Sequence, residues 1–232
     1  MSNTLTLEEL DRDGAIREGA EALSGLSRGS FLRRSALAGG GLLGGGAALA
    51  LLTPGVAAAA TKGDVAILNY ALTLEYLETA FYQEALAMGA LKGRVLHLAK
   101  VVGGHEAQHV AALKGALGKA AIAKPTFDFK GTTSDQAKFM ATSIVLEDTG
   151  VAAYKGQAPL ISDDKILAAA LAIHTVEARH ASWIRDLSGK SPAPVAFDQP
   201  LSMSAVLSAV KATGFISTSR STTSKSSPKF TG

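Results

Sequence analysis

A four-residue pattern that can bind metal occurs twice in this chain. Residues 106–109 read Glu-Ala-Gln-His and residues 177–180 read Glu-Ala-Arg-His. Residues three apart share one face of a helix, so each pattern would present a carboxylate beside an imidazole. A lone glutamate also lies in an apolar stretch upstream of each pattern. Four carboxylates and two imidazoles form a ligand set for two metal ions in a helical bundle. The six candidate metal ligands are Glu75, Glu106, His109, Glu147, Glu177 and His180.

The ligand set is duplicated along the chain. The separation of Glu75 from Glu147 is almost the same as the separation of the two Glu-x-x-His patterns. Tyr82 follows Glu75 at the same spacing as Tyr154 follows Glu147. We expect a repeated helical hairpin that supplies one glutamate from its first helix and Glu-x-x-His from its second. The tyrosines would lie one to two helical turns from the metal ions. They would either hydrogen-bond to a ligand, as candidate catalytic residues, or simply pack in the core.

Four long helices are needed to hold these residues at one level. Apolar residues recur at helical spacing, and glycine, aspartate or serine signals bound the runs. The predicted helices cover residues 67–88, 91–117, 135–157 and 162–187. A chain that leaves the bundle centre and returns at about 1.5 Å per residue needs roughly 12–15 residues each way, plus a loop. The intervals from Glu75 to Glu106 and from Glu147 to Glu177 both suit this length.

The fold class is therefore all-α, an antiparallel four-helix bundle. The interval from Glu106 to Glu147 is longer than the other two, which predicts one longer central crossover between the two hairpins. We assign residues 61–190 to the bundle and residues 191–216 to a loop with a short helix near 202–210. Residues 217–232 are rich in serine, threonine and basic residues, which predicts a disordered tail.

Composition limits the chemistry further. Apolar residues make up 47% of the chain, enough for a core, and burying four carboxylates in that core without compensation would be prohibitive. Two divalent cations would neutralise them. There is no cysteine, which excludes disulfides, thiolate metal sites and thiol nucleophiles. The net charge of +3 is mild and no basic stripe carries interleaved aromatics, so we expect no nucleic-acid partner.

The segment 1–60 has the pattern of an N-terminal extension with an export signal. Basic residues at 28, 33 and 34 precede a Gly/Ala-rich apolar run over 35–52 and a small-residue segment over 56–60. Residues 27–33 resemble a twin-arginine signal except for Gly29, which stands where the second arginine is expected. We expect export to the periplasm, cell envelope or exterior by the twin-arginine machinery. The alternative is an uncleaved membrane anchor.

A zinc peptidase is the competing interpretation of the first pattern. Residues 105–109 also read His-Glu-x-x-His, in which His105 and His109 would bind zinc and Glu106 would be the general base. The second copy has Val176 where His105 stands, so this histidine is not part of the repeated unit. The zinc interpretation also leaves Glu75 and the second Glu-x-x-His pattern without a role.

Other titratable residues near the ligands have open roles. Glu78 competes with Glu75, but only Glu75 matches the second copy in its spacing to a tyrosine. Glu78 would then either hydrogen-bond to a ligand or lie in solvent. His174, three residues before Glu177, could contact a ligand, act as an extra one, or be an ordinary core residue. His97 has the same alternatives.

The segment from about residue 65 to 187 resembles the ferritin-like superfamily of di-iron carboxylate proteins, because the pattern of six ligands is complete. Residues 71–78, followed by Ala80-Phe81-Tyr82, are similar to exported bacterial ferritin-like proteins that include desiccation-associated members. The loop around 197–201 is similar to the same group.

The resemblance implies a ferritin-like bundle with two iron ions, or manganese as the alternative. It implies that Glu106 and Glu177 bridge the metals, with Glu75 and His109 completing one site and Glu147 and His180 the other. The implied activity is oxidation of Fe(II) with O₂ or H₂O₂, or peroxide consumption, in stress protection. The alternative is a non-catalytic desiccation- or envelope-associated protein whose bundle is stabilised by metal. A homo-oligomer is compatible with either.

Overall fold

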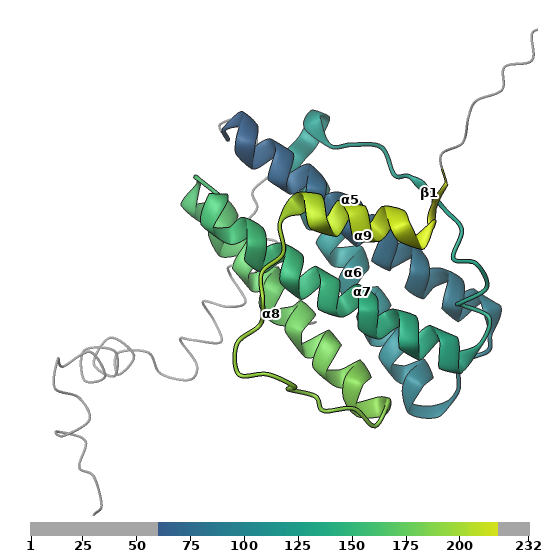
Figure 1. Cartoon of the computed structure of the whole chain (residues 1–232). Helices are drawn as coiled ribbons and strands as arrows, with labels where there is room; N and C mark the ends of the chain where they lie inside the picture. Colours follow the sequence, from purple (N-terminus) through teal and green to yellow (C-terminus); the bar gives the residue numbers. More distant parts are fainter. Residues whose placement is uncertain (1–59, 218–232) are drawn as a thin grey trace, which may run out of the picture. The chain divides into compact units, whose positions relative to one another are not determined.

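The computed structural model describes residues 60–217, which form a bundle of four long helices with a shorter helix beside it (Figure 1). The predicted export signal before residue 60 and the predicted tail after residue 217 lie outside the described residues. Within residues 60–217, no helix is both long enough and apolar enough to cross a membrane.

The four long helices pair as two hairpins. They are α5 (Lys62–Met88), α6 (Gly93–Leu117), α7 (Gln136–Gln157) and α8 (Asp164–Leu187). Helix α5 packs most extensively on α6, and α7 on α8. The connection from α6 to α7 is the longest link within the bundle. The predicted all-α antiparallel bundle with one longer central crossover is therefore confirmed.

Local capping chemistry explains where these helices begin and end. Asp135 and Asp163 accept hydrogen bonds from backbone N–H groups in the first turns of α7 and α8. Gly89 ends α5 in the left-handed conformation, at φ 68°. Helix α5 begins before its predicted start, because the hydroxyl of Thr61 accepts from the N–H of Asp64 and caps an additional turn.

The short elements lie outside the bundle. They are the 3₁₀ turns η2 (Gly118–Ala120) and η3 (Ala158–Leu160), the helix α9 (Met203–Thr213) and the strands β1 (Thr126–Phe127) and β2 (Ile216–Ser217). The strands pair antiparallel, with Thr126 opposite Ser217, and fasten the chain after α9 to the central crossover. The sequence does not predict this pair, and the predicted tail wrongly includes Ser217. The predicted short helix is present as α9.

A strap of residues 190–202 leads from α8 to α9 across α7. The N–H of Leu201 donates to the carbonyl of Ala152 at 3.0 Å. A Cβ at Gly156 would lie 1.9 Å from the carbonyl oxygen of Leu201, so a glycine is required for the strap to approach α7 this closely. Val206 and Val210 of α9 are then buried in the core.

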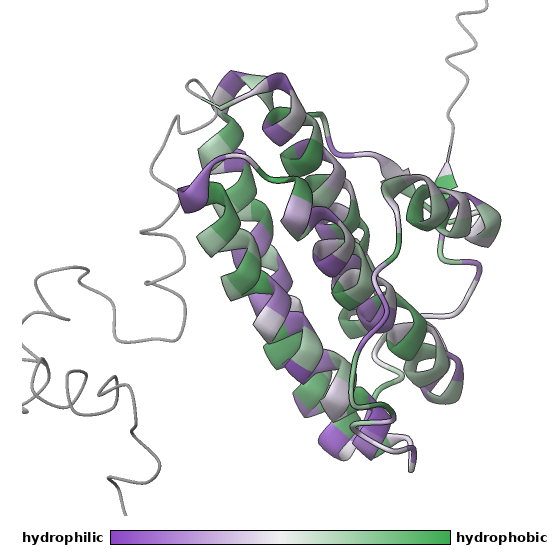
Figure 2. Cartoon of the chain, turned by 60° about the vertical axis from the view of Figure 1, so that its left-hand side comes forward, coloured by the Kyte–Doolittle hydropathy of each residue, from purple (hydrophilic) through white to green (hydrophobic). Residues whose placement is uncertain are grey.

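Two apolar clusters fill the bundle, and they define where the polar site lies. One contains Val102 of α6 and Ile184 of α8, and the other contains Leu113 of α6 and Ile173 of α8. Both Glu-x-x-His patterns fall between these positions along their helices. Figure 2 shows hydrophobic and hydrophilic residues alternating along the helices, as expected for an apolar interior and a polar surface. The candidate site is therefore a polar layer between two apolar ones.

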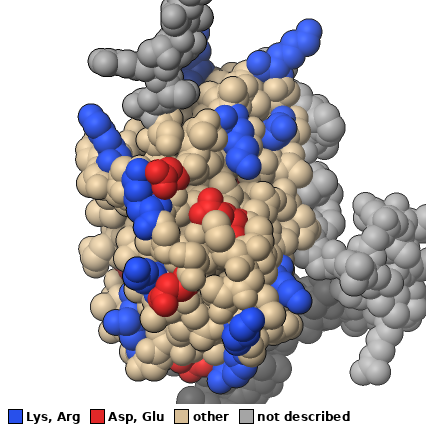
Figure 3. All heavy atoms as spheres, turned by 90° about the vertical axis from the view of Figure 1, so that its right-hand side faces the viewer, with Lys and Arg blue, Asp and Glu red and all other residues tan. Residues whose placement is uncertain are grey.

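Charges on the visible face in Figure 3 are dispersed. Lysine and arginine side chains lie singly or beside acidic ones and do not gather into a continuous stripe on that face. The bundle interior, by contrast, holds a cluster of buried glutamates.

Candidate metal centre

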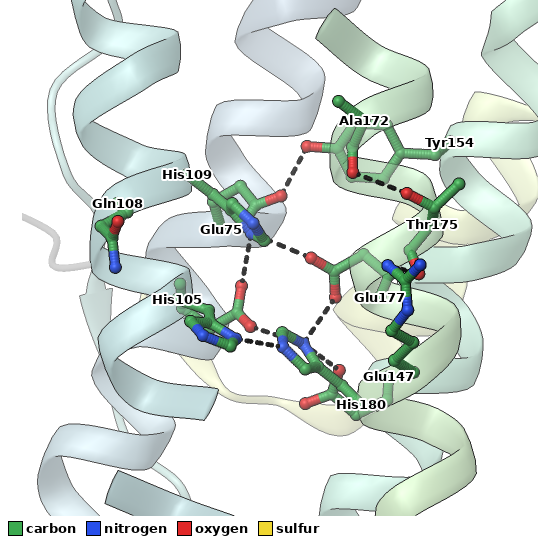
Figure 4. A network of polar contacts seen from close by, with 12 residues as sticks. Glu75, His105, Gln108, His109, Glu147, Tyr154, Ala172, Thr175, Glu177 and His180 are labelled. Atoms are coloured by element: carbon green, nitrogen blue, oxygen red, sulfur yellow. Dashed lines mark hydrogen bonds and ion pairs between the residues drawn. The ribbon is translucent and has the colours of Figure 1, made fainter. Parts of the chain in front are cut away.

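The structure brings all six predicted ligands together at mid-bundle. Figure 4 labels each of them except Glu106. Helices α5 and α7 each supply one glutamate, and α6 and α8 each supply one Glu-x-x-His pair. All four glutamates have no exposed surface, and His109 and His180 are 9% and 3% exposed. The six residues are Glu75, Glu106, His109, Glu147, Glu177 and His180.

The ligand atoms form two overlapping groups, each compact enough to surround one ion. Within each group the possible ligand atoms all lie within 4.8 Å of one another. Glu106 and Glu177 belong to both groups. The first group adds Glu75 and His109, and the second adds Glu147 and His180. This grouping is compatible with a dinuclear site in which two carboxylates are shared.

The shared glutamates direct one oxygen into each group. Nδ1 of His109 lies 3.1 Å from Oε2 of Glu106 and 2.9 Å from Oε1 of Glu177. Nδ1 of His180 lies 3.0 Å from the other oxygen of Glu106 and 3.5 Å from the other oxygen of Glu177. The unshared glutamates complete the groups, with Glu75 3.2 Å from His109 Nδ1 and Glu147 3.3 Å from His180 Nδ1.

Several of these buried atoms lie close to one another without a partner in hydrogen-bonding geometry. They are Oε1 of Glu106, Oε2 of Glu147, both carboxylate oxygens of Glu177 and Nδ1 of His180. A buried polar atom without a partner costs free energy, and a carboxylate costs more. A cation at the centre of each group would satisfy them all. The donor set of carboxylate oxygens and imidazole nitrogens suits iron or manganese, so these residues fit a pair of such ions.

The histidines hold protons firmly in this environment. Burial alone would lower the pKa of His180, but the adjacent Glu106, Glu147 and Glu177 outweigh it and raise the pKa to about 12. Burial also opposes protonation of His109, and Glu75 with its neighbours raises the pKa of His109 far above its usual range. A metal ion must therefore displace a proton from each Nδ1.

The carboxylates differ in how readily they ionise. Burial raises the pKa of Glu147 to about 7, although His180 opposes the shift. Burial and the charge of Glu177 raise the pKa of Glu106 well above its usual value. Burial would also raise the pKa of Glu177, but the two histidines reverse this and lower it to about 2. Glu177 is thus the most strongly ionised of these three carboxylates.

The two predicted tyrosines hydrogen-bond to ligands, and each bonds to the ligand of the other hairpin. Tyr82 of α5 donates to Oε1 of Glu147 on α7. Tyr154 of α7 donates to Oε1 of Glu75 on α5 at 2.5 Å. Ser143 lies 2.5 Å from the Tyr82 oxygen and supports that side only. The tyrosines therefore fix the unshared glutamates, and their bonds exclude the packing-only alternative.

Gly103 on α6 allows Tyr82 to occupy its position. A Cβ at Gly103 would lie 2.9 Å from Cβ of the fully buried Tyr82. We expect Gly103→Ala to lower the free energy of unfolding by about 1–3 kcal/mol through overpacking. Gly104 is exposed and its Cβ would meet nothing within 4 Å. Gly104→Ala should therefore stabilise the helix by about 0.5–1 kcal/mol. Urea unfolding of both variants checks this, and equal effects would contradict it.

Glu78 is a fifth buried carboxylate beside the cluster, not a solvated residue. It is 3% exposed, and burial together with the charge of Glu177 raises its pKa well above the usual value. It belongs to neither ligand group. Gly150 occupies the corresponding position in the second hairpin, and a Cβ there would lie 3.5 Å from Oε1 of Glu78. Glu78 and Gly150 are separated by the same interval as Glu75 and Glu147. This shared spacing is the sequence signal that could have indicated that Gly150 leaves room for Glu78.

His105 lies outside both ligand groups. Its Nδ1 is 2.9 Å from Nε2 of His180, on the side of that ring that faces away from the carboxylates. Burial lowers the pKa of His105. The zinc-peptidase interpretation needs His105 and His109 on one ion, whereas the structure places His105 behind His180. The sequence alone does not predict this contact.

The remaining histidines make no direct contribution to the groups. His174 is half-buried, its Nε2 has no hydrogen-bond partner, and burial lowers its pKa. His97 packs edge-on against Trp183 with ring centroids 5.7 Å apart. Among residues 60–217, the two groups described above contain neither histidine.

The fold and the site define a helical-bundle protein with a candidate dinuclear carboxylate centre. Comparison with known families agrees, since a model described as a ferritin-like domain matches residues 63–190, more than half of the chain. The chain belongs to the ferritin-like domain family. No curated protein matches it.

Proposed function

We propose that this protein binds two iron ions in the bundle and couples oxidation of Fe(II) to reduction of O₂ or H₂O₂. The observation that carries the proposal is the pair of overlapping ligand groups, which share Glu106 and Glu177 and leave buried atoms without partners. Glu75 and His109 would complete one ion's ligands, and Glu147 and His180 the other's. Manganese, with peroxide consumption, is the alternative metal.

Iron would supply the redox chemistry. Two Fe(II) ions would give one electron each. O₂ would take up both electrons and two protons to become H₂O₂, or H₂O₂ would take up both electrons and two protons to become two molecules of water. The residues of the chain would hold the ions and orient their ligands. Tyr82 and Tyr154 orient the unshared glutamates, and the apolar layers above and below exclude bulk water. The Nδ1 atoms of His109 and His180 release their protons when metal binds.

Metal analysis and activity assays of the purified full-length chain test this proposal. We expect about two iron ions per chain after anaerobic loading, followed by Fe(II) oxidation when O₂ or H₂O₂ is added. Iron that binds without either reaction would favour the structural alternative, in which metal only stabilises the bundle. One zinc ion, with peptidase activity lost in Glu106→Gln, would favour the peptidase. Fewer than about one metal ion per chain would contradict every proposal that involves a metal.

Export and a role in stress protection stay predictions from the sequence. They depend on the twin-arginine-like residues 27–33 and on the resemblance to exported ferritin-like proteins.

A further inference from the structure

The two halves of the centre differ in whether the histidine has a hydrogen-bonding partner on the side of its ring away from the carboxylates. His180 has a partner, because Nδ1 of His105 lies 2.9 Å from its Nε2. The two rings lie edge to edge and nearly coplanar, with centroids 5.2 Å apart and 19° between their planes, as an N–H···N hydrogen bond requires. In the second hairpin the position before the first residue of Glu-x-x-His holds Val176, which has no hydrogen-bonding side chain. His109 is also the less enclosed imidazole, with 11% of its side chain exposed against 3% for His180.

The partner of an imidazole decides which ring nitrogen is free to bind metal. Nδ1 of His180 faces the carboxylates, so a metal ion there would use the Nδ1 lone pair and leave the ring proton on Nε2. That N–H is then placed to donate to Nδ1 of His105. A partner of this kind fixes the tautomer and orientation of a metal ligand, and removing one typically costs about 10–100-fold in metal affinity.

We propose that His105 is a positioning residue that makes the two metal positions unequal, with the Glu147–His180 position binding the first ion more tightly. This inference rests on the proposed dinuclear site and deepens it. His105 itself binds no metal, since it acts through His180. The residue that gives the first pattern its zinc-peptidase appearance thus acts on the histidine of the other hairpin.

Titration of the full-length, metal-free protein with Mn(II) under anaerobic conditions tests the inference. Loss of the free Mn(II) EPR signal counts bound ions without any activity measurement. We expect two binding steps that differ by at least about 10-fold in affinity. His105→Val, which copies Val176, should weaken the tighter step by about 10-fold or more and bring the two steps together. His105→Asn keeps an acceptor close to the position of Nδ1 and should restore most of the difference.

Two ligand variants assign the steps. His109→Ala should retain the tighter step, and His180→Ala should remove it. Circular dichroism and unfolding of the metal-free forms check that each variant is folded, and His105→Ala replaces His105→Val if valine disturbs the helix. Two ions that bind with equal affinity, or a tighter step unchanged in His105→Val, would overturn this inference alone. Failure of the wild-type chain to bind even one ion would instead overturn the proposed function.

Discussion

Glu177→Gln is expected to abolish binding of both metal ions, whereas Glu75→Gln removes one and leaves the other. Glu177 belongs to both ligand groups and directs one oxygen towards each histidine, while Glu75 belongs to the first group only. Glu177 also has the lower pKa of the two shared carboxylates, so it supplies the negative charge most fully. The amide isostere loses that charge at both positions. The affinity loss should exceed the roughly 10–100-fold that removal of an outer partner costs.

Metal content after loading at one fixed iron concentration checks this expectation. The wild-type chain should hold about two ions, Glu75→Gln about one, and Glu177→Gln close to none. Both glutamates are fully buried, so the two variants make the same chemical change at equally buried positions and control for each other. Equal metal loss in the two variants would show that Glu177 is not shared. Full retention of metal in Glu177→Gln would contradict the proposal that these residues bind two metal ions.

The metal-free protein is expected to lose stability as pH rises from about 5 to about 8, and metal should reverse this trend. Glu147 has its pKa raised from 4.5 to about 7, so across that interval the folded state binds a proton that the unfolded state has lost. The cost is on the order of 2–3 kcal/mol. The raised pKa of His180 acts in the same direction from 6.5 upwards. The lowered pKa of Glu177 acts oppositely, but only between about 2 and 4.5.

Bound metal reverses the dependence of stability on pH, because the ligands must lose their protons to bind it. Metal affinity therefore increases with pH, and so does the stability that metal adds. Urea unfolding with chelator and with Fe(II) or Mn(II), at about pH 5 and about pH 8 and constant ionic strength, measures both trends. Glu147→Gln should flatten the metal-free profile, since it removes that titration. A metal-free protein that is more stable at the higher pH would contradict the assigned shifts.

The sequence was sufficient to predict the helices because their ends depend on local chemistry. Asp135, Asp163 and Gly89 form caps within a few residues of their own positions. The strand pair could not be predicted because each strand has two residues and the partners, Thr126 and Ser217, lie far apart in the sequence. A two-residue strand has too few positions to show alternation.

The identities of the candidate ligands could be predicted from the sequence. The hydrogen bonds and the packing around them could not. Helical periodicity and duplication single out Glu106 and Glu177 from the sequence alone. The crossed bonds of Tyr82 and Tyr154 depend on how α5 and α7 face each other, which only packing decides. The burial of Glu78 likewise depends on Gly150, a residue on a different helix.

Each hairpin contributes residues to the other hairpin's half of the centre, as each subunit does in a twofold-symmetric dimer. Here both halves belong to one polypeptide. Each ligand group takes residues from both hairpins, since Glu177 enters the group of Glu75 and Glu106 enters the group of Glu147. In an isologous pair, each copy likewise contributes the same residues to its partner's half. Neither hairpin can therefore assemble a complete metal position by itself. A single hairpin with this pattern would need a second copy of itself to do so.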